Sequence, residues 1–196
     1  MAALKASQRM NPGFRQRPCR ALFAALLPAA ALLVTLGSPA RGDEPPLEYQ
    51  VKAAFLLNFT KFVQWPPSAF ADDRAPLAIC IRGEDPFGNT LDEIVKGEAV
   101  NGHELVVQRM ARGPVPKTCQ VLFVAKSEKE VQRILADLGP GVLTVGETEN
   151  FLQDGGILAF VIENRRVRFD IHQSAAANAM LTISSRLMTV ARSVQR

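Results

Sequence analysis

Residues 77–97 read LAICIRGEDPFGNTLDEIVKG, and within this stretch a strand pattern changes to a helix pattern. The apolar run at 77–82 is typical of a buried strand. Asp85 and Pro86 then match an N-cap followed by proline at the first helical position. We therefore predict a strand over 77–82 and a helix from Asp85 to Lys96, a unit from which α/β sheets are built.

The same two patterns alternate through the rest of the chain. Helices are predicted over 47–64, 127–138, 174–180 and 183–194, and strands over 104–110, 120–125, 142–145, 157–162 and 166–171. Ser127 and Glu130 match a capping box, and Asn164 matches the turn of a hairpin between the last two strands. This order predicts one domain of the α/β class, a sandwich with a mixed sheet of about five to six strands flanked by helices.

The net charge of +4 comes from the N-terminal region, because residues 1–40 hold five basic residues and no acidic residue. The remainder of the chain is close to neutral, which argues against nucleic-acid binding. In residues 1–40 a basic region precedes an apolar run at 21–36 and the small residues 37–40, which is the order of a secretory signal peptide. We predict a signal peptide over 1–40 and an exported, periplasmic domain over 41–196.

The predicted cleavage site follows Ala40, with Gly42 as the alternative. A retained membrane anchor is the other interpretation of the apolar run. That run is shorter than the ~20 residues that span a bilayer, and Pro28 interrupts it, so we predict no membrane span after cleavage.

Export determines how Cys80 and Cys119 are interpreted, because disulfides persist outside the cytoplasm. Both lie on or beside apolar, strand-like runs, and neighbouring strands can bring their Cα atoms within bonding range. We predict a disulfide between them. Two buried thiols and a metal site are the alternatives, although the two distant histidines make a metal site a poor case.

The sequence contains no recognisable catalytic set. Its two histidines, His103 and His172, accompany no G-x-S-x-G elbow, so we predict no catalytic residue, no metal ligand and no cofactor. Arg82, Gly83 and Asp85 follow a predicted strand at its carboxyl end, where open α/β sheets bind small ligands. These three residues are our candidates for a ligand crevice, although the segment lacks a phosphate-binding motif and a simple turn with a cap is the favoured alternative.

The helix predicted over 47–64 is apolar on more than one face, with Val51, Phe55, Phe59 and Phe62 as its expected core stripe. Such a helix is either buried in its own domain or docked against another chain. The last predicted helix is a second candidate surface. The predicted interface candidates are Phe55, Leu56, Phe59, Phe62, Trp65, Arg186 and Leu187.

The segment 52–66, KAAFLLNFTKFVQWP, resembles the opening motif of the YfiR family of exported proteins. The turn at 83–88 is similar to a second marker of that family. A third extends through 155–187, from the paired glycines to the segment ISSRL. The resemblance covers about residues 47–191, nearly all of the predicted mature chain.

The resemblance implies a periplasmic α/β protein, often a homodimer, without known enzymatic activity. The family's namesake represses an inner-membrane diguanylate cyclase by binding its periplasmic region, which lowers cyclic-di-GMP and disfavours biofilm. The resemblance also implies the Cys80–Cys119 disulfide, whereas a second disulfide of some members has no counterpart here. We expect a periplasmic regulator of this kind, and the alternative is a periplasmic small-ligand-binding module without a cyclase partner.

Overall fold

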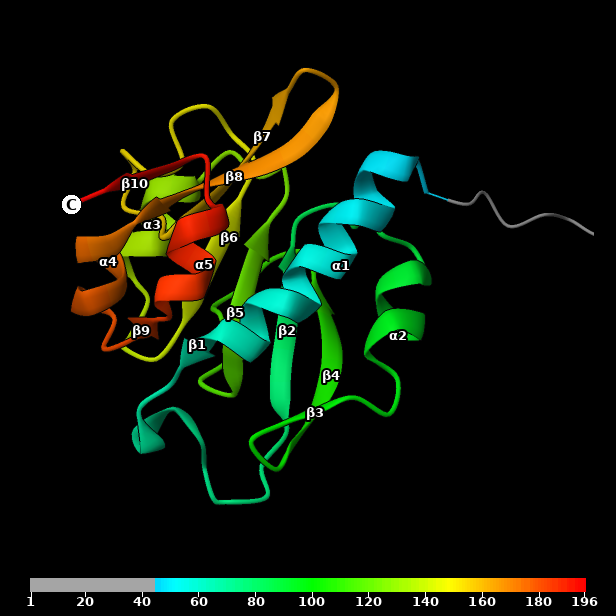
Figure 1. The fold of residues 1–196 in the computed structure, drawn as a ribbon. Helices are drawn as coiled ribbons and strands as arrows, with labels where there is room; N and C mark the ends of the chain where they lie inside the picture. The colour runs from blue at the N-terminus through cyan, green and yellow to red at the C-terminus, as the bar shows by residue number, and fades with distance from the viewer. Residues whose placement is uncertain (1–44) are drawn as a thin grey trace, which may run out of the picture. The chain divides into compact units, whose positions relative to one another are not determined.

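One mixed sheet of eight strands organises residues 45–196, which are the residues described by this computed structural model (Figure 1). The strands lie in the order β10-β8-β7-β6-β5-β2-β4-β3. Their bounds are β2 Leu77–Arg82, β3 Ala99–Val100, β4 His103–Met110, β5 Cys119–Val124, β6 Leu143–Gly146, β7 Leu158–Glu163, β8 Arg166–His172 and β10 Ser193–Gln195. A separate antiparallel pair joins β1 Val63–Gln64 to β9 Thr182–Ile183. The predicted signal peptide lies outside the described residues.

Helices connect these strands. Their bounds are α1 Leu47–Phe62, the short 3-10 helix η1 Pro67–Ala69, α2 Thr90–Val95, α3 Val131–Ala136, α4 Gln173–Asn178 and α5 Ser185–Val190. Among the described residues, no helix is long and apolar enough to cross a membrane. The predicted α/β class with a mixed sheet is confirmed, but the sheet is wider than predicted because β3 and β10 add two short strands at its edges.

The centre of the sheet is parallel. Strand β2 lies between β5 and β4 and runs parallel to both, and all six of its residues are buried, as expected for a strand covered on both faces. Strands β5, β6 and β7 continue the parallel part, whereas β7 and β8 form an antiparallel hairpin. Asn164 and Arg165 have φ values of 50° and 61° in the hairpin turn, which confirms the turn predicted at Asn164.

Each face of the sheet carries its own apolar cluster. On one face, α1 packs its Phe59 ring 5.0 Å from Phe169 and 5.7 Å from Phe160, measured between ring centroids. On the other face, Phe151 packs in a second cluster that includes Ile134 of α3. The sheet is therefore covered on both sides, as the two layers of helices in Figure 1 show.

A disulfide between Cys80 and Cys119 links β2 to β5 within the second cluster, with a Cα–Cα distance of 6.0 Å. The parallel register places Cys119 beside Ala78 and Cys80 beside Leu122, so adjacent strands bring the two sulfurs together. Both cysteines are buried, at 0% and 1% exposure. The predicted disulfide is confirmed.

Two helices begin later than predicted, because their expected caps have other partners. The Asp85 carboxylate accepts the backbone N–H of Phe87 at 2.7 Å and forms a turn of its own before α2. The Ser127 hydroxyl accepts the backbone N–H of Glu84 at 2.8 Å, which ties two loops together instead of capping α3. A local sequence pattern cannot reveal the bond to Ser127, because its donor, the Glu84 N–H, lies in a different loop, 43 residues away in the sequence.

The C-terminal segment also differs from its prediction. The helix expected over 183–194 is the shorter α5, whose first turn is capped by the Ser184 hydroxyl accepting the Leu187 N–H at 3.3 Å. The residues that follow form β10, which pairs with β8 in parallel. Arg192 donates from Nε to Asp170 at 2.8 Å and helps to hold this final strand.

The buried face of α1 is rotated from the predicted stripe. Its buried residues are Lys52, Ala53, Leu56, Phe59 and Thr60. Val51, which was predicted in the core, is 36% exposed, whereas Lys52 is 1% exposed. The lysine occupies a core position because a buried carboxylate meets it there, as described below.

Candidate functional site

The strand order reverses between β2 and β5, and the carboxyl ends of these strands meet a small cavity. From β2 the chain passes through α2 to β4 on one side, and from β5 it passes through α3 to β6 on the other. Open α/β sheets commonly bind ligands at such a reversal. The cavity measures about 230 Å³ and is lined by Tyr49, Glu84, Asp85, Pro86, Ala125, Lys126, Ser127 and Glu147. We call it the carboxyl-end cavity.

The predicted crevice residues at this end are engaged by the chain itself. Arg82 donates from Nε to Glu128 at 2.8 Å and from Nη1 to the Gly113 carbonyl at 2.6 Å. The Asp85 carboxylate accepts the Arg109 Nε–H at 2.6 Å in addition to its turn bond. Asp85 lines the cavity, but its hydrogen-bonding capacity is largely used.

Gly83, the third predicted crevice residue, has a φ of 93° and lies outside the lining of the carboxyl-end cavity. A Cβ atom there would lie 2.8 Å from the Ser127 hydroxyl oxygen. Glycine is therefore required by the left-handed turn and the close approach of two loops. This gives Gly83 a structural role that its sequence context did not distinguish from ligand binding.

A buried charge cluster, absent from the sequence predictions, adjoins the carboxyl-end cavity, because its members Tyr49 and Glu147 line that cavity. The Lys52 ammonium lies 2.5 Å from Glu147 and 2.5 Å from Glu48. The Lys52 and Glu147 side chains are each 2% exposed, whereas the Glu48 side chain reaches solvent. A buried charge is tolerated when it is paired and hydrogen-bonded, so these residues hold one another.

Tyr49 completes this cluster. Its hydroxyl donates to Glu147 at 3.2 Å, and the Lys52 ammonium lies 4.5 Å from the centre of its ring. Burial of the phenol and the adjacent Glu147 carboxylate raise the pKa of Tyr49 to about 12. The hydroxyl therefore stays protonated at neutral pH and serves as a hydrogen-bond donor to the carboxylate.

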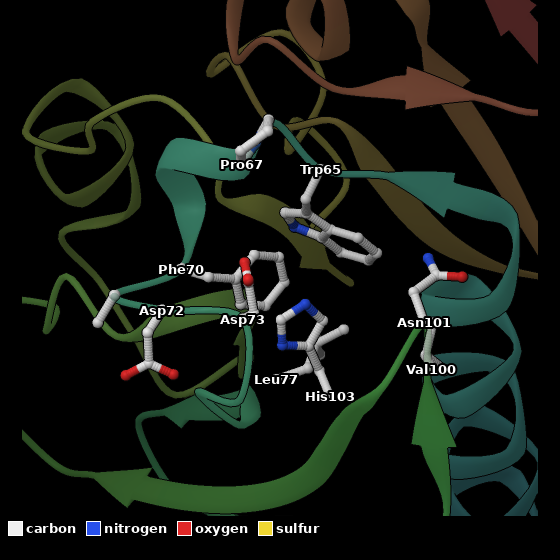
Figure 2. A pocket seen from close by; sticks show the side chains of 10 residues that line it. Trp65, Pro67, Phe70, Asp72, Asp73, Leu77, Val100, Asn101 and His103 are labelled. Carbon is white, nitrogen blue, oxygen red and sulfur yellow. The ribbon is translucent and has the colours of Figure 1, made fainter.

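A larger cavity lies at the opposite end of the same strands, where β2, β4 and β5 begin (Figure 2). It measures about 400 Å³ and is lined by Trp65, Pro67, Phe70, Ala71, Asp72, Asp73, Leu77, Val100, Asn101 and His103. We call it the amino-end cavity. Its volume falls within the range of small-molecule sites.

Gln120 fixes one wall of the amino-end cavity. Its side chain is buried, donates to the Ala69 carbonyl at 2.6 Å and accepts the Ala78 N–H at 2.8 Å. Its backbone carbonyl accepts the Trp65 indole N–H at 3.2 Å. The segment that leaves α1 through Trp65 is therefore tied to the first residues of β2 and β5.

His103 and Phe70 form the opposite wall. Their rings stack with centroids 3.8 Å apart and an interplanar angle of 7°. The Nδ1 atom of His103 lies 2.6 Å from the Ala75 carbonyl oxygen, which assigns the proton to Nδ1 in the neutral ring. The second ring nitrogen, Nε2, remains an acceptor in that tautomer.

The predicted interface residues separate into two groups. Leu56, Phe59 and Leu187 are buried in the chain's own core and are not available at its surface. The others retain exposed area: Phe55, Phe62, Trp65 and Arg186. The aromatic character of 52–66 is thus used mainly for packing against the sheet, because Phe55 also lies 5.5 Å from the Phe169 ring.

The outward face of α1 has a different composition from the predicted stripe. Its exposed residues follow helical spacing and are Leu47, Val51, Ala54, Asn58 and Lys61. The N-terminal half of this face is apolar, and Leu47 is 72% exposed. We call Leu47, Val51 and Ala54 the α1 patch.

A comparison with models of protein families finds a match over residues 49–192. The description of the matching model is YfiR/HmsC-like. The chain belongs to the YfiR/HmsC-like family. The match includes α1 from Tyr49 onward, the disulfide and both cavities, so the predicted YfiR family is confirmed.

Beyond the YfiR/HmsC-like family, the similarities are distant. A crystal structure of a conserved domain protein from Vibrio cholerae O1 biovar El Tor str. N16961 has 10% sequence identity and a TM-score of 0.46. The similarity covers 77% of this chain and 60% of that chain, so this chain spans about 60% of the length of that structure. No curated protein matches the chain.

Sequence reasoning missed the amino-end cavity for a physical reason. Its walls come from the segment 65–73 and the β3–β4 turn, which are joined by stacking and by Gln120 rather than by a motif. Trp65 was predicted, but as an interface residue. The one signal available in the sequence was an aromatic residue, Phe70, close to Asp72 and Asp73 in a polar loop.

Proposed function

We propose that this chain is an exported periplasmic regulatory binding protein that represses a membrane-bound diguanylate cyclase through its periplasmic region. Repression would lower cyclic-di-GMP signalling and biofilm formation. The observation that carries the proposal is membership of the YfiR/HmsC-like family over residues 49–192. The domain acts by binding in this proposal, and we assign it no catalytic residue.

Repression by binding requires a difference in affinity between two states of the partner. The chain must bind the inactive state of the cyclase more tightly than the active state, because equal affinity shifts no equilibrium. Preferential binding by a factor of about 100 corresponds to about 2.7 kcal/mol. A surface of a few exposed apolar side chains can supply a difference of this size.

We assign the partner contact to the α1 patch and the exposed parts of Phe55 and Phe62. Leu47 and Val51 are large apolar residues exposed on a helix that is otherwise firmly packed. Because α1 is held by the Phe59 contacts and by the Lys52–Glu147 pair, it presents this patch rigidly. Rigid presentation reduces the entropy that binding costs.

Gene deletion with measurement of cellular cyclic-di-GMP tests the function. Deletion is expected to raise cyclic-di-GMP several-fold, and the exported chain supplied from a plasmid is expected to restore the low level. An unchanged level after deletion contradicts cyclase repression.

Two matched variants test the surface. Val51→Glu places a charge in the α1 patch and is expected to abolish complementation. Ala136→Glu places the same charge at an exposed position of α3, a helix that packs against the other face of the sheet. This variant is expected to complement fully. Equal behaviour of the two variants, with both present at wild-type levels in the periplasm, contradicts the assignment of the surface.

Export and dimerisation belong to the same proposal. We propose that residues 1–40 are a cleaved signal peptide and that the mature chain is a periplasmic homodimer. Cell fractionation with N-terminal sequencing of the mature chain is expected to place the new terminus at Arg41 or Asp43. Sedimentation equilibrium is expected to give twice the mass of the mature chain, and a monomer at micromolar concentration would contradict the dimer.

A further inference from the structure

The amino-end cavity is lined by aromatic rings whose polar hydrogens are already engaged. The indole N–H of Trp65 donates to the Gln120 carbonyl, and His103 uses Nδ1 on the Ala75 carbonyl. What these rings offer to a cavity occupant is therefore their π-electron density and the free Nε2 lone pair. Figure 2 shows the Trp65 indole across the cavity from the His103 and Phe70 rings.

The charges at the amino-end cavity are of one sign. Asp72 and Asp73 line it, and among its lining residues there is no lysine or arginine. Asp72 accepts the Arg74 backbone N–H at 2.8 Å, and its side chain is directed away from the rings in Figure 2. Within residues 45–196, no hydrogen bond or ion pair engages the Asp73 carboxylate.

This combination differs from that of the carboxyl-end cavity. There the acidic residues Glu147 and Asp85 are bonded to Lys52 and Arg109 of the same chain. At the amino end, the Asp73 carboxylate, which has no cationic partner within residues 45–196, lines the same cavity as three aromatic rings. Aromatic faces attract cations through the ring quadrupole, and the attraction increases when water is excluded. An anionic ligand would meet two carboxylates and no compensating positive side chain.

We propose that the amino-end cavity binds a small organic cation with a quaternary or alkylated ammonium head group. Trp65 on one wall and the stacked Phe70–His103 pair on the other face the head group, and Asp73 supplies the opposite charge. The volume of about 400 Å³ leaves room for a further part of the molecule beyond the ammonium. The test of this site involves no cyclase, so this proposal and the proposed cyclase repression can fail separately.

Choline and its neutral isostere 3,3-dimethyl-1-butanol provide the direct test, because the isostere has carbon in place of the charged nitrogen. Trp65 is the single tryptophan of the chain, so intrinsic fluorescence of the full exported protein reports on this cavity. Saturation-transfer NMR of the same titrations gives a second measurement that does not depend on a fluorescence change. Choline is expected to bind saturably, and the isostere about tenfold more weakly, corresponding to loss of the cation–π and charge contributions.

Matched charge variants identify the residues. Asp73→Asn is expected to weaken choline binding by about fivefold to tenfold while leaving binding of the neutral isostere unchanged. Asp137→Asn removes the same charge at the end of α3, outside the cavity, and is expected to change neither. Phe70→Leu is expected to weaken choline more than the isostere, because it replaces a ring with an apolar side chain of similar size.

Three results would overturn the proposal. The first is the absence of saturable choline binding in both fluorescence and NMR. The second is equal affinity for choline and the isostere, which would show a merely apolar cavity. The third is an equal effect of Asp73→Asn and Asp137→Asn, which would assign the preference to the overall charge of the protein. Urea unfolding of each variant verifies that the titrated protein is folded.

Discussion

The two ends of the parallel sheet share strands β2 and β5, yet the chain treats them in opposite ways. At the carboxyl end, where the cavity is small, the charged groups of the Lys52–Glu147 and Arg82–Glu128 pairs satisfy one another. At the amino end, a larger cavity is lined by aromatic rings and by Asp73, whose carboxylate has no partner in the described part of the chain. The reversal of strand order indicates a crevice at the carboxyl end, whereas the pairing of side chains decides which end can accept a ligand.

The largest expected effect is at the carboxyl end. Among residues 45–196, Lys52 is the one basic side chain paired with buried Glu147, so Lys52→Met leaves that carboxylate uncompensated, and we expect a loss of about 4 kcal/mol in the free energy of unfolding. Urea denaturation followed by circular dichroism measures this loss. The double variant Lys52→Met with Glu147→Leu is expected to recover most of it, because both charges are then absent. A single variant no less stable than the double would show that the pair is not buried as described.

The disulfide has the next largest expected effect. Replacing both Cys80 and Cys119 with serine is expected to cost about 3 kcal/mol, because the bond closes a loop with a sequence separation of 39 residues. Urea denaturation under oxidising conditions measures the difference. Thiol titration of the native wild-type chain is the control and is expected to find no reactive thiol at either position. Equal stability of the variant and the oxidised wild type would contradict a stabilising role.

Glu128 at the carboxyl end gives a smaller effect that depends on pH. Hydrogen bonding from the Glu130 backbone N–H, together with Arg82, lowers the pKa of Glu128. A lowered carboxyl pKa stabilises the fold above the ordinary glutamate pKa, and this contribution is lost as pH falls through the folded-state value. Glu128→Gln is therefore expected to cost about 1 kcal/mol at pH 7 and less at pH 3.

The control for Glu128 is Glu149→Gln, which changes an exposed glutamate. Its cost is expected to be close to zero at both pH values. Unfolding of the three proteins in urea at pH 7 and pH 3 completes the comparison. If Glu128→Gln costs the same at both pH values, the stabilisation does not depend on ionisation of the Glu128 carboxylate, and the prediction is wrong.

The smallest expected effect is at the amino end. Asp73→Asn is expected to change the free energy of unfolding by less than about 0.5 kcal/mol, because the exposed carboxylate supports no other group of the fold. The same urea experiment measures it beside Lys52→Met. A loss above 1 kcal/mol would mean that Asp73 stabilises its loop, and the contrast between the two ends would then fail.

Local patterns predicted the strands and the hairpin well, because apolar runs such as 77–82 and the turn at Asn164 depend on neighbouring residues. They failed where a partner is distant. Ser127 bonds the Glu84 loop instead of capping a helix, and Lys52 is buried because Glu147 lies beside it. Nothing near Lys52 in the sequence distinguishes it from a solvent-exposed lysine, so the rotation of α1 could not be predicted.

The candidate sites followed the same rule. The crevice residue Asp85 was placed correctly at the carboxyl end of β2, but its bond to Arg109 was not foreseen because it depends on the β2–β4 pairing. The amino-end cavity was missed altogether, since stacking between Phe70 and His103 joins two turns that no motif connects. Position in a sheet is thus more predictable than the state of the groups found there.

The covalent link between β2 and β5 also bears on how the exported chain matures. Residues 45–196 contain two cysteines, Cys80 and Cys119, so this region has a single possible intramolecular pairing. Thiol–disulfide exchange within it cannot produce a scrambled isomer that later needs correction. Its oxidative folding therefore requires an electron acceptor and no disulfide isomerase.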